Sequence, residues 1–206
     1  MAYKNFTLEK LRDEFGIQTR RQALSEFNGI SEIQPSDWLL ETLKNYQLLP
    51  NRSEKAKSEA IVSPILLEIK RRNIDFITIY SGEILTADSS KGLNGECDFI
   101  IARETHSLTI DAPLFCVVEA KKGDLDLGKA QCAAQMLGAK LFNQNHDAEN
   151  SIVYGVVTTA KEWLFMKIEN NLLISDDDNT ISLVELPKLL GNFQFIVDFY
   201  RNKEND

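Results

Sequence analysis

The stretch that most constrains the fold is the seven-residue run Cys116–Lys122, which places charged side chains at the end of an apolar segment. The apolar part, Phe115–Val118, contains two β-branched residues, a pattern typical of a buried strand. Because strand side chains alternate between faces, Glu119 and Lys121 project from one face and Ala120 from the other. A carboxylate and an ammonium group at the end of a buried strand cost free energy unless they have a role there. This stretch therefore predicts a functional site at a strand end.

A second carboxylate lies on the strand-like segment that precedes this stretch. Twenty residues separate Asp98 from Glu119. The pattern of Asp98 followed by Glu119-Ala120-Lys121 on a neighbouring strand resembles the PD-(D/E)XK nuclease superfamily, whose members share the restriction-endonuclease-like fold. The resemblance covers residues 54–159.

Two further elements resemble this family, and one family element is missing. Glu59 opens a predicted apolar helix, where many members carry an additional acid; its alternative role is a favourable charge near a helix N-terminus. Gln131 and Gln135 lie one turn apart on a later predicted helix and resemble the Gln-x-x-x-Gln element of some branches; the alternative is a polar helix face. The proline of the family motif is missing, since Cys97 stands before Asp98.

The resemblance implies metal-dependent hydrolysis of phosphodiester bonds, with Mg²⁺ as cofactor and Mn²⁺ as its substitute. Mg²⁺ prefers oxygen ligands and keeps several waters, so two carboxylates suffice. Lys121 is expected to orient the attacking water and to stabilise negative charge, and Gln131 and Gln135 to align this lysine or contact phosphate. The expected metal ligands are Asp98, Glu119, the Ala120 carbonyl and Glu59, and the expected catalytic residues are Asp98, Glu119, Lys121 and Gln131.

Other interpretations of these residues stay open. Glu119 can form a structural ion pair with Lys121 or Lys122, although two buried acids and a lysine are a poor stabilising device, because desolvation cancels much of the gain. The chain can also be a catalytically silent, nuclease-like binding or regulatory subunit. A phosphohydrolase is a third reading, for which the sequence has no Gly-rich phosphate loop. DNA or RNA, and endo- or exonucleolytic cleavage, are left open by the sequence.

The formal net charge of −8 bears on the partners. It counts against a stand-alone, non-specific DNA binder, which is usually basic. It does not exclude a nuclease, because acids that bind metal are part of the count. We expect nucleic acid, in the first place DNA, as substrate. A homodimer is expected because cutting both strands of a duplex usually needs two sites, and a protein partner is the alternative source of specificity.

The remaining composition indicates a cytoplasmic protein with a good core. Of the 206 residues, 43% are hydrophobic, yet no apolar run approaches the ~20 residues that span a bilayer. The N-terminus lacks the apolar segment of a signal peptide, so we expect no membrane association. The three cysteines contain no Cys-x-x-Cys pair and are expected to be buried free thiols. The two histidines, His106 and His146, lie far apart, which argues against zinc chemistry and a His-based triad.

Hydrophobic periodicity and turn signals predict an α/β fold with a restriction-endonuclease-like core: a helix, three strands, a helix and a strand, with a mixed central sheet flanked by helices. The same order also fits a generic α/β arrangement. We interpret residues 1–206 as one domain with a helical extension (1–50), the core (51–160) and a hairpin followed by a C-terminal helix (161–206). The expected helices are 7–16, 19–27, 35–46, 53–72 with a kink at Pro64 or a break with Ser63 as a second cap, one capped by Asp126, and 187–202. The expected strands are 76–86, 96–103, 114–121, 152–158, 163–168 and 172–174, with a loop over 87–95.

Overall fold

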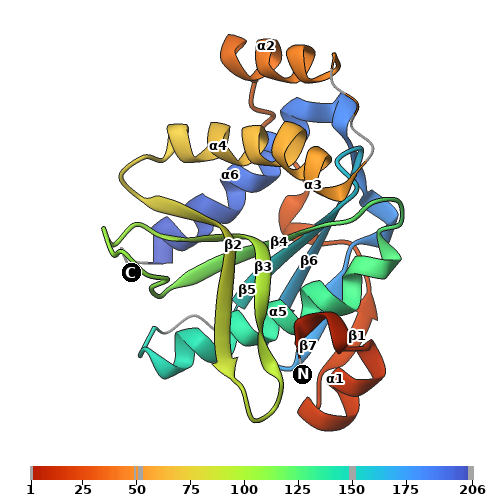
Figure 1. Cartoon of the computed structure of the whole chain (residues 1–206), viewed down its shortest axis with the longest axis vertical. Helices are drawn as coiled ribbons and strands as arrows, with labels where there is room; N and C mark the ends of the chain where they lie inside the picture. The colour runs from red at the N-terminus through yellow and green to blue at the C-terminus, as the bar shows by residue number, and fades with distance from the viewer. Residues whose placement is uncertain (1, 49, 51–52, 149–151, 204–206) are drawn as a thin grey trace.

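A mixed sheet forms the centre of the molecule (Figure 1). The computed structural model describes residues 2–48, 50, 53–148 and 152–203, so the predicted segment ends at 1, 51 and 206 lie outside the described residues. Within them, eight strands form one sheet in the order β1-β7-β6-β5-β4-β3-β2, with β8 beside β6. The strands are β1 (Gln18–Arg21), β2 (Ile77–Asp88), β3 (Leu93–Arg103), β4 (Leu114–Ala120), β5 (Ile152–Thr158), β6 (Glu162–Glu169), β7 (Leu172–Ser175) and β8 (Ile181–Ser182).

Pairing in this sheet combines both directions. β4 and β5 are parallel, as are β1 and β7, and the other neighbours are antiparallel. All residues of β4 and β5 are buried, as expected for parallel strands covered on both faces. The predicted α/β class with a mixed sheet is confirmed, and so is the order of helix, three strands, helix and strand.

Helices cover both faces of the sheet (Figure 1). One core lies between the sheet and α4 and α6, and a second lies between the sheet, α5 and the N-terminal segment. No helix in the described part of the chain is long and apolar enough to cross a membrane. The helical elements are η1 (Tyr3–Asn5), α1 (Leu8–Phe15), η2 (Ser25–Phe27), α2 (Asp37–Tyr46), α3 (Glu54–Lys57), η3 (Ser58–Val62), α4 (Ser63–Arg72), α5 (Asp126–Asn145), η4 (Asp177–Asn179), η5 (Leu183–Glu185) and α6 (Leu186–Lys203).

The local signals at two N-terminal helices are confirmed. The Thr7 side chain caps α1, which ends at Gly16 in the left-handed conformation (φ 70°). The Ser36 side chain caps α2 in the same way. The predicted β6–β7 hairpin and the C-terminal helix are also present.

The predicted helix over residues 19–27 is wrong. Gln18–Arg21 is instead the edge strand β1, which pairs in parallel with β7, and only Ser25–Phe27 is helical, as a 3₁₀ turn. All four residues of β1 are exposed, while Ile17 and Leu24 are buried on either side of it. The backbone pairing with β7, more than 150 residues away in the chain, therefore outweighs the local helical pattern. The N-terminal extension is consequently part of the sheet and is not purely helical.

Three local boundaries also differ from prediction. Pro64 lies in the first turn of α4, which continues a π-helical turn, η3, so Ser63 starts no separate capped helix. Asp126 does not cap α5 but is its first residue; its N–H donates to Asp124 Oδ1 at 2.8 Å. The expected loop over 87–95 is a short turn, because β2 extends to Asp88 and β3 begins at Leu93.

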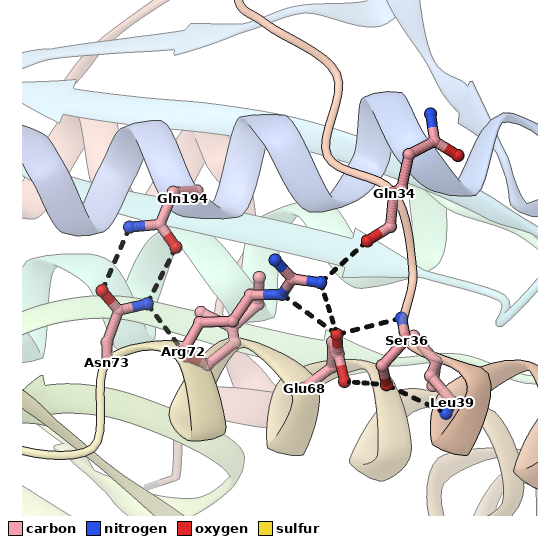
Figure 2. Close-up of polar contacts among 8 residues, drawn as sticks. Gln34, Ser36, Leu39, Glu68, Arg72, Asn73 and Gln194 are labelled. Carbon is pink, nitrogen blue, oxygen red and sulfur yellow. Dashed lines mark hydrogen bonds and ion pairs between the residues drawn. The ribbon is translucent and has the colours of Figure 1, made fainter.

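A buried polar network fastens α2 and α6 to α4 (Figure 2). Glu68, 2% exposed, accepts hydrogen bonds from the Ser36 N–H at 3.2 Å, the Ser36 hydroxyl at 2.7 Å and Arg72 at 2.7 Å. Asn73 and Gln194 exchange side-chain hydrogen bonds of 2.8 and 3.0 Å between α4 and α6. A buried carboxylate is tolerated only when it is bonded in this way. The network therefore fixes the helix that leads into β2.

Candidate active site

The alternation of β4 directs its polar end toward α5. Val118 packs in the core on the α4 and α6 side, whereas Val117 packs in the core on the α5 side. Glu119 follows Val117 by two residues and so faces α5. Lys121 comes directly after the strand and lies on the same side, as predicted. The chain thus brings a carboxylate and an ammonium group to the N-terminal half of one helix.

Two glutamines of α5 hold these groups. Lys121 Nζ donates to Glu119 Oε1 at 2.6 Å and to Gln131 Oε1 at 3.1 Å. Gln135 Nε2 donates to Glu119 Oε2 at 2.7 Å. Because Gln131 and Gln135 are one turn apart, they reach adjacent groups from one helix face. The predicted alignment of Lys121 by Gln131 is therefore seen as a direct hydrogen bond, and Gln135 orients the carboxylate.

Asp98 joins this cluster from β3. The β3–β4 register ends with Phe99 beside Val118, and Asp98 and Glu119 are the next residues along the two strands. Asp98 Oδ2 accepts a hydrogen bond from the Ala120 N–H at 2.7 Å. The contact that the structure shows from Ala120 is thus its N–H, and the role of its carbonyl stays a prediction.

The cluster lines a hollow of about 360 Å³ at the surface. Asp98, Glu119, Lys121 and Gln131 all border it, so four of the predicted site residues meet at one place. Glu119 is 1% exposed and lies at its base. The other lining residues are Ala2, Tyr3, Lys4, Glu54, Gly95 and Glu96.

The surroundings of the two carboxyl groups disfavour their ionised forms. Burial and the charge of Asp98 raise the pKa of Glu119 to about 7, although Lys121 and Gln135 partly offset this. Burial also raises the pKa of Asp98. Burial lowers the pKa of Lys121, but the bond to Glu119 and its charge outweigh this and leave the pKa raised. Lys121 therefore stays charged. The proton that is taken up near neutral pH goes to the carboxyl pair.

A hard cation would relieve this repulsion. Within the described residues, no group of three or more His, Cys, Asp or Glu side chains is placed to hold a metal ion. Asp98 and Glu119 supply two carboxylates, which fits a Mg²⁺ ion that keeps most of its waters. A cation here would share the oxygens of Glu119 with Lys121 and Gln135.

Glu59 lies farther from the centre than predicted, and Glu54 lies nearer. Glu59 has a side chain 66% exposed, pairs with Lys55 at 3.8 Å, and borders a second hollow of about 350 Å³ that also touches Asp98. Glu54 borders both hollows, and its charge acts on the pKa of both Asp98 and Lys121. Glu54 and Glu96 were not predicted for the site; the Ser53 cap that starts α3 at Glu54 is the sequence signal that marks the first of them.

A larger hollow of about 510 Å³ lies beyond the site, at the N-terminus of α5. Its cations are held by acids: Lys129 Nζ lies 2.6 Å from Asp126 and 2.8 Å from Asp177, and Arg21 pairs with Asp177 and Asp178. The hollow that borders Glu119 and Lys121 is the stronger candidate, because a raised carboxyl pKa and a hydrogen-bonded lysine coincide there.

No protein-family model and no curated protein sequence matches the chain. The functional assignment therefore depends on the residues that meet in the site and on the fold that brings them together.

Proposed function

We propose that the chain is a metal-dependent nuclease of the PD-(D/E)XK type, with a restriction-endonuclease-like core, that hydrolyses phosphodiester bonds in nucleic acid, in the first place DNA. The observation that carries this proposal is the meeting of Asp98, Glu119 and Lys121 at the end of β4, with Lys121 Nζ 2.6 Å from Glu119 and 3.1 Å from Gln131. Two acids and a lysine at one strand end match the residue types that phosphodiester hydrolysis needs.

Each residue has a role that its surroundings support. Asp98 and Glu119 would hold Mg²⁺ or Mn²⁺, which supplies charge neutralisation of the phosphate and a more acidic water when bound. Lys121 carries a positive charge and a side chain only 17% exposed. Its ammonium group would orient the attacking water and stabilise the charge that develops on phosphate, an effect that is strong where water is largely excluded. Gln131 and Gln135 keep the lysine and Glu119 in place.

A nuclease-like binding or regulatory subunit is the second candidate. The net charge of −8 favours it, because polyanion binding by an acidic protein needs help from cations or from a partner. In that case the protein partner would choose the substrate. A partner could do the same for an active enzyme that works in a complex, and a homodimer is the other expected assembly.

Cleavage assays with matched variants test the proposal. Single- and double-stranded DNA and RNA are incubated with Mg²⁺ or Mn²⁺ at low salt. Glu119→Ala should lose both metal binding and cleavage, whereas Lys121→Ala should keep its metal affinity and lose about 10²-fold or more in rate. Lys122→Ala is the matched control and should cleave normally. If the wild type cleaves none of these substrates, with or without lysate partners, the binding-subunit function replaces the nuclease.

A further inference from the structure

The carboxylate site borders two neighbouring hollows. The hollow that contains Glu119 and Lys121 and the second hollow beside α3 share three lining residues, Glu54, Glu96 and Asp98. The two hollows are therefore neighbours that meet at these three residues, and we call them together the trough. At one end of the trough lies the N-terminal segment, and at the other end lie α3 and the Ser81-Gly82 stretch of β2.

Lys4 borders the first end of the trough, held there by its neighbour Tyr3. Tyr3 is 1% exposed and packs against α5 where that helix has Gly138. A Cβ atom at Gly138 would lie 2.2 Å from the Tyr3 hydroxyl oxygen, so the close fit requires glycine. Lys4 itself is exposed. A buried aromatic anchor thus fixes a solvent-facing lysine at the rim of the site.

Lys55 borders the other end, on α3. The Ser53 hydroxyl caps this short helix by accepting the Ala56 N–H at 3.0 Å. Lys57 Nζ donates to the Lys122 carbonyl at 2.7 Å, which ties α3 to the chain just after Lys121. The Lys55 side chain is 84% exposed, and its Nζ lies 3.8 Å from Glu59, a separation at which the ammonium group still has donors to offer a ligand.

Most charged side chains that line the trough are acidic, and Lys4 and Lys55 are among its few cations. The acids along the trough are Glu54, Glu59, Glu96, Asp98 and Glu119, and its lysines are Lys4, Lys55 and Lys121. Lys121 is already engaged by Glu119 and Gln131. A phosphate on either side of the reacting one would meet Glu54, Glu59 or Glu96 unless a cation faced it, and Lys4 and Lys55 are placed to do so.

We propose that Lys4 and Lys55 bind the phosphates that flank the scissile one, so that a nucleic-acid strand runs along the trough and is cut at an internal phosphodiester bond. The inference rests on the proposed nuclease function and adds the substrate class to it: a strand with phosphates on both sides of the reacting bond. A dinucleoside monophosphate, which has the scissile phosphate alone, lacks both contacts.

The test measures kcat and KM with Mg²⁺ for an oligonucleotide and for a dinucleoside monophosphate at several salt concentrations. On the oligonucleotide, Lys4→Ala and Lys55→Ala should each raise KM about tenfold, as expected for a charged hydrogen bond, and leave kcat within about twofold. Each should also reduce the slope of log(kcat/KM) against log salt by about 0.7–0.9, as for one lost phosphate contact. Lys4→Arg and Lys55→Arg should restore most of the loss.

The controls separate this inference from the nuclease function itself. Lys44→Ala removes an exposed lysine of α2 that borders neither hollow and should change nothing. The dinucleoside monophosphate should be a poor substrate, and its cleavage should not respond to either alanine variant. If the wild type cuts both substrates equally well, or if both variants keep the wild-type KM and salt slope, the flanking contacts are refuted and the nuclease stands. If the wild type cuts neither substrate, both proposals fall together.

Discussion

Replacing Glu119 by glutamine should raise the free energy of unfolding relative to the wild type as the pH rises, whereas most substitutions of buried residues lower it. Glutamine keeps the size of the side chain but does not titrate. Its Oε1 can accept from Lys121, and its Nε2 can donate to Gln135 once the Gln135 amide turns to present its Oε1 in place of the Nε2 that now donates to Glu119. In the folded chain, burial and the charge of Asp98 raise the pKa of Glu119 from 4.5 to about 7. A carboxyl group whose pKa is raised by folding stabilises the fold in its protonated form, so this contribution is complete below pH 4.5 and is lost as the pH rises through 7.

The size of the effect follows from the same values. Each tenfold difference in acidity corresponds to about 1.4 kcal/mol. A pKa raised from 4.5 to about 7 therefore costs the wild type about 3 kcal/mol of unfolding free energy between acidic pH and pH 8. This is a large part of the roughly 5–15 kcal/mol that stabilises a typical domain. Glu119→Gln removes this cost, so its stability relative to wild type should grow by that amount over the same interval.

Urea unfolding of both proteins in EDTA, from pH 4.5 to pH 8, measures the difference directly. As the pH rises, the free energy of unfolding of the wild type should fall relative to that of Glu119→Gln. Mg²⁺ should cancel this fall, because a cation replaces the proton. A difference that is independent of pH, or that changes in favour of the wild type, would show that Glu119 is an ordinary ion-pair partner of Lys121 and would refute the electrostatic account of the site.

Three more results are expected. Glu68→Gln should destabilise the fold at pH 7 by about 2 kcal/mol, and urea unfolding should show that this loss shrinks as the pH falls. Burial raises the pKa of Glu68, but hydrogen bonds from Ser36 and Arg72 outweigh this and leave the pKa lowered. The pH trend should therefore be opposite to that at Glu119. All three cysteines are buried, and burial raises the pKa of their thiols, so a thiol reagent should label none of them without denaturant. Mg²⁺ at about 100 times its Kd should stabilise the wild type by about 2.7 kcal/mol and raise its Tm, whereas the Asp98→Ala/Glu119→Ala double variant should show no change.

The centre of the site follows from local sequence patterns. The apolar run that ends in Glu119 and Lys121 predicts a buried strand, and the strand period of two predicts that both side chains share a face. The four-residue spacing of Gln131 and Gln135 predicts one helix face. The structure brings these four side chains into direct contact, since each pattern depends only on residues close together in the chain.

The features that sequence patterns missed depend on distant contacts or on helix geometry. β1 exists because Gln18–Arg21 meet β7, a pairing that no short window contains. Glu54 borders the centre of the site while Glu59 lies farther out, and the π-helical turn Ser58–Val62 separates the start of this helix from α4. Glu59 lies within this turn, and a π-helical turn changes the angular relation of its residues to those before it, so α-helical spacing alone does not predict which acid borders the centre of the site.

The central claim is that Asp98 and Glu119 share a divalent cation beside Lys121. Crystals soaked in Mn²⁺ test this with anomalous diffraction, because the ion identifies itself by its own signal. The account predicts one strong peak between the two carboxylates, within about 2.0–2.4 Å of an oxygen from each, and no such peak in Glu119→Ala crystals. An ion bound only elsewhere, for instance at the acidic turn of Asp177 and Asp178, or an unchanged Glu119–Lys121 pair without any ion at saturating Mn²⁺, would contradict it.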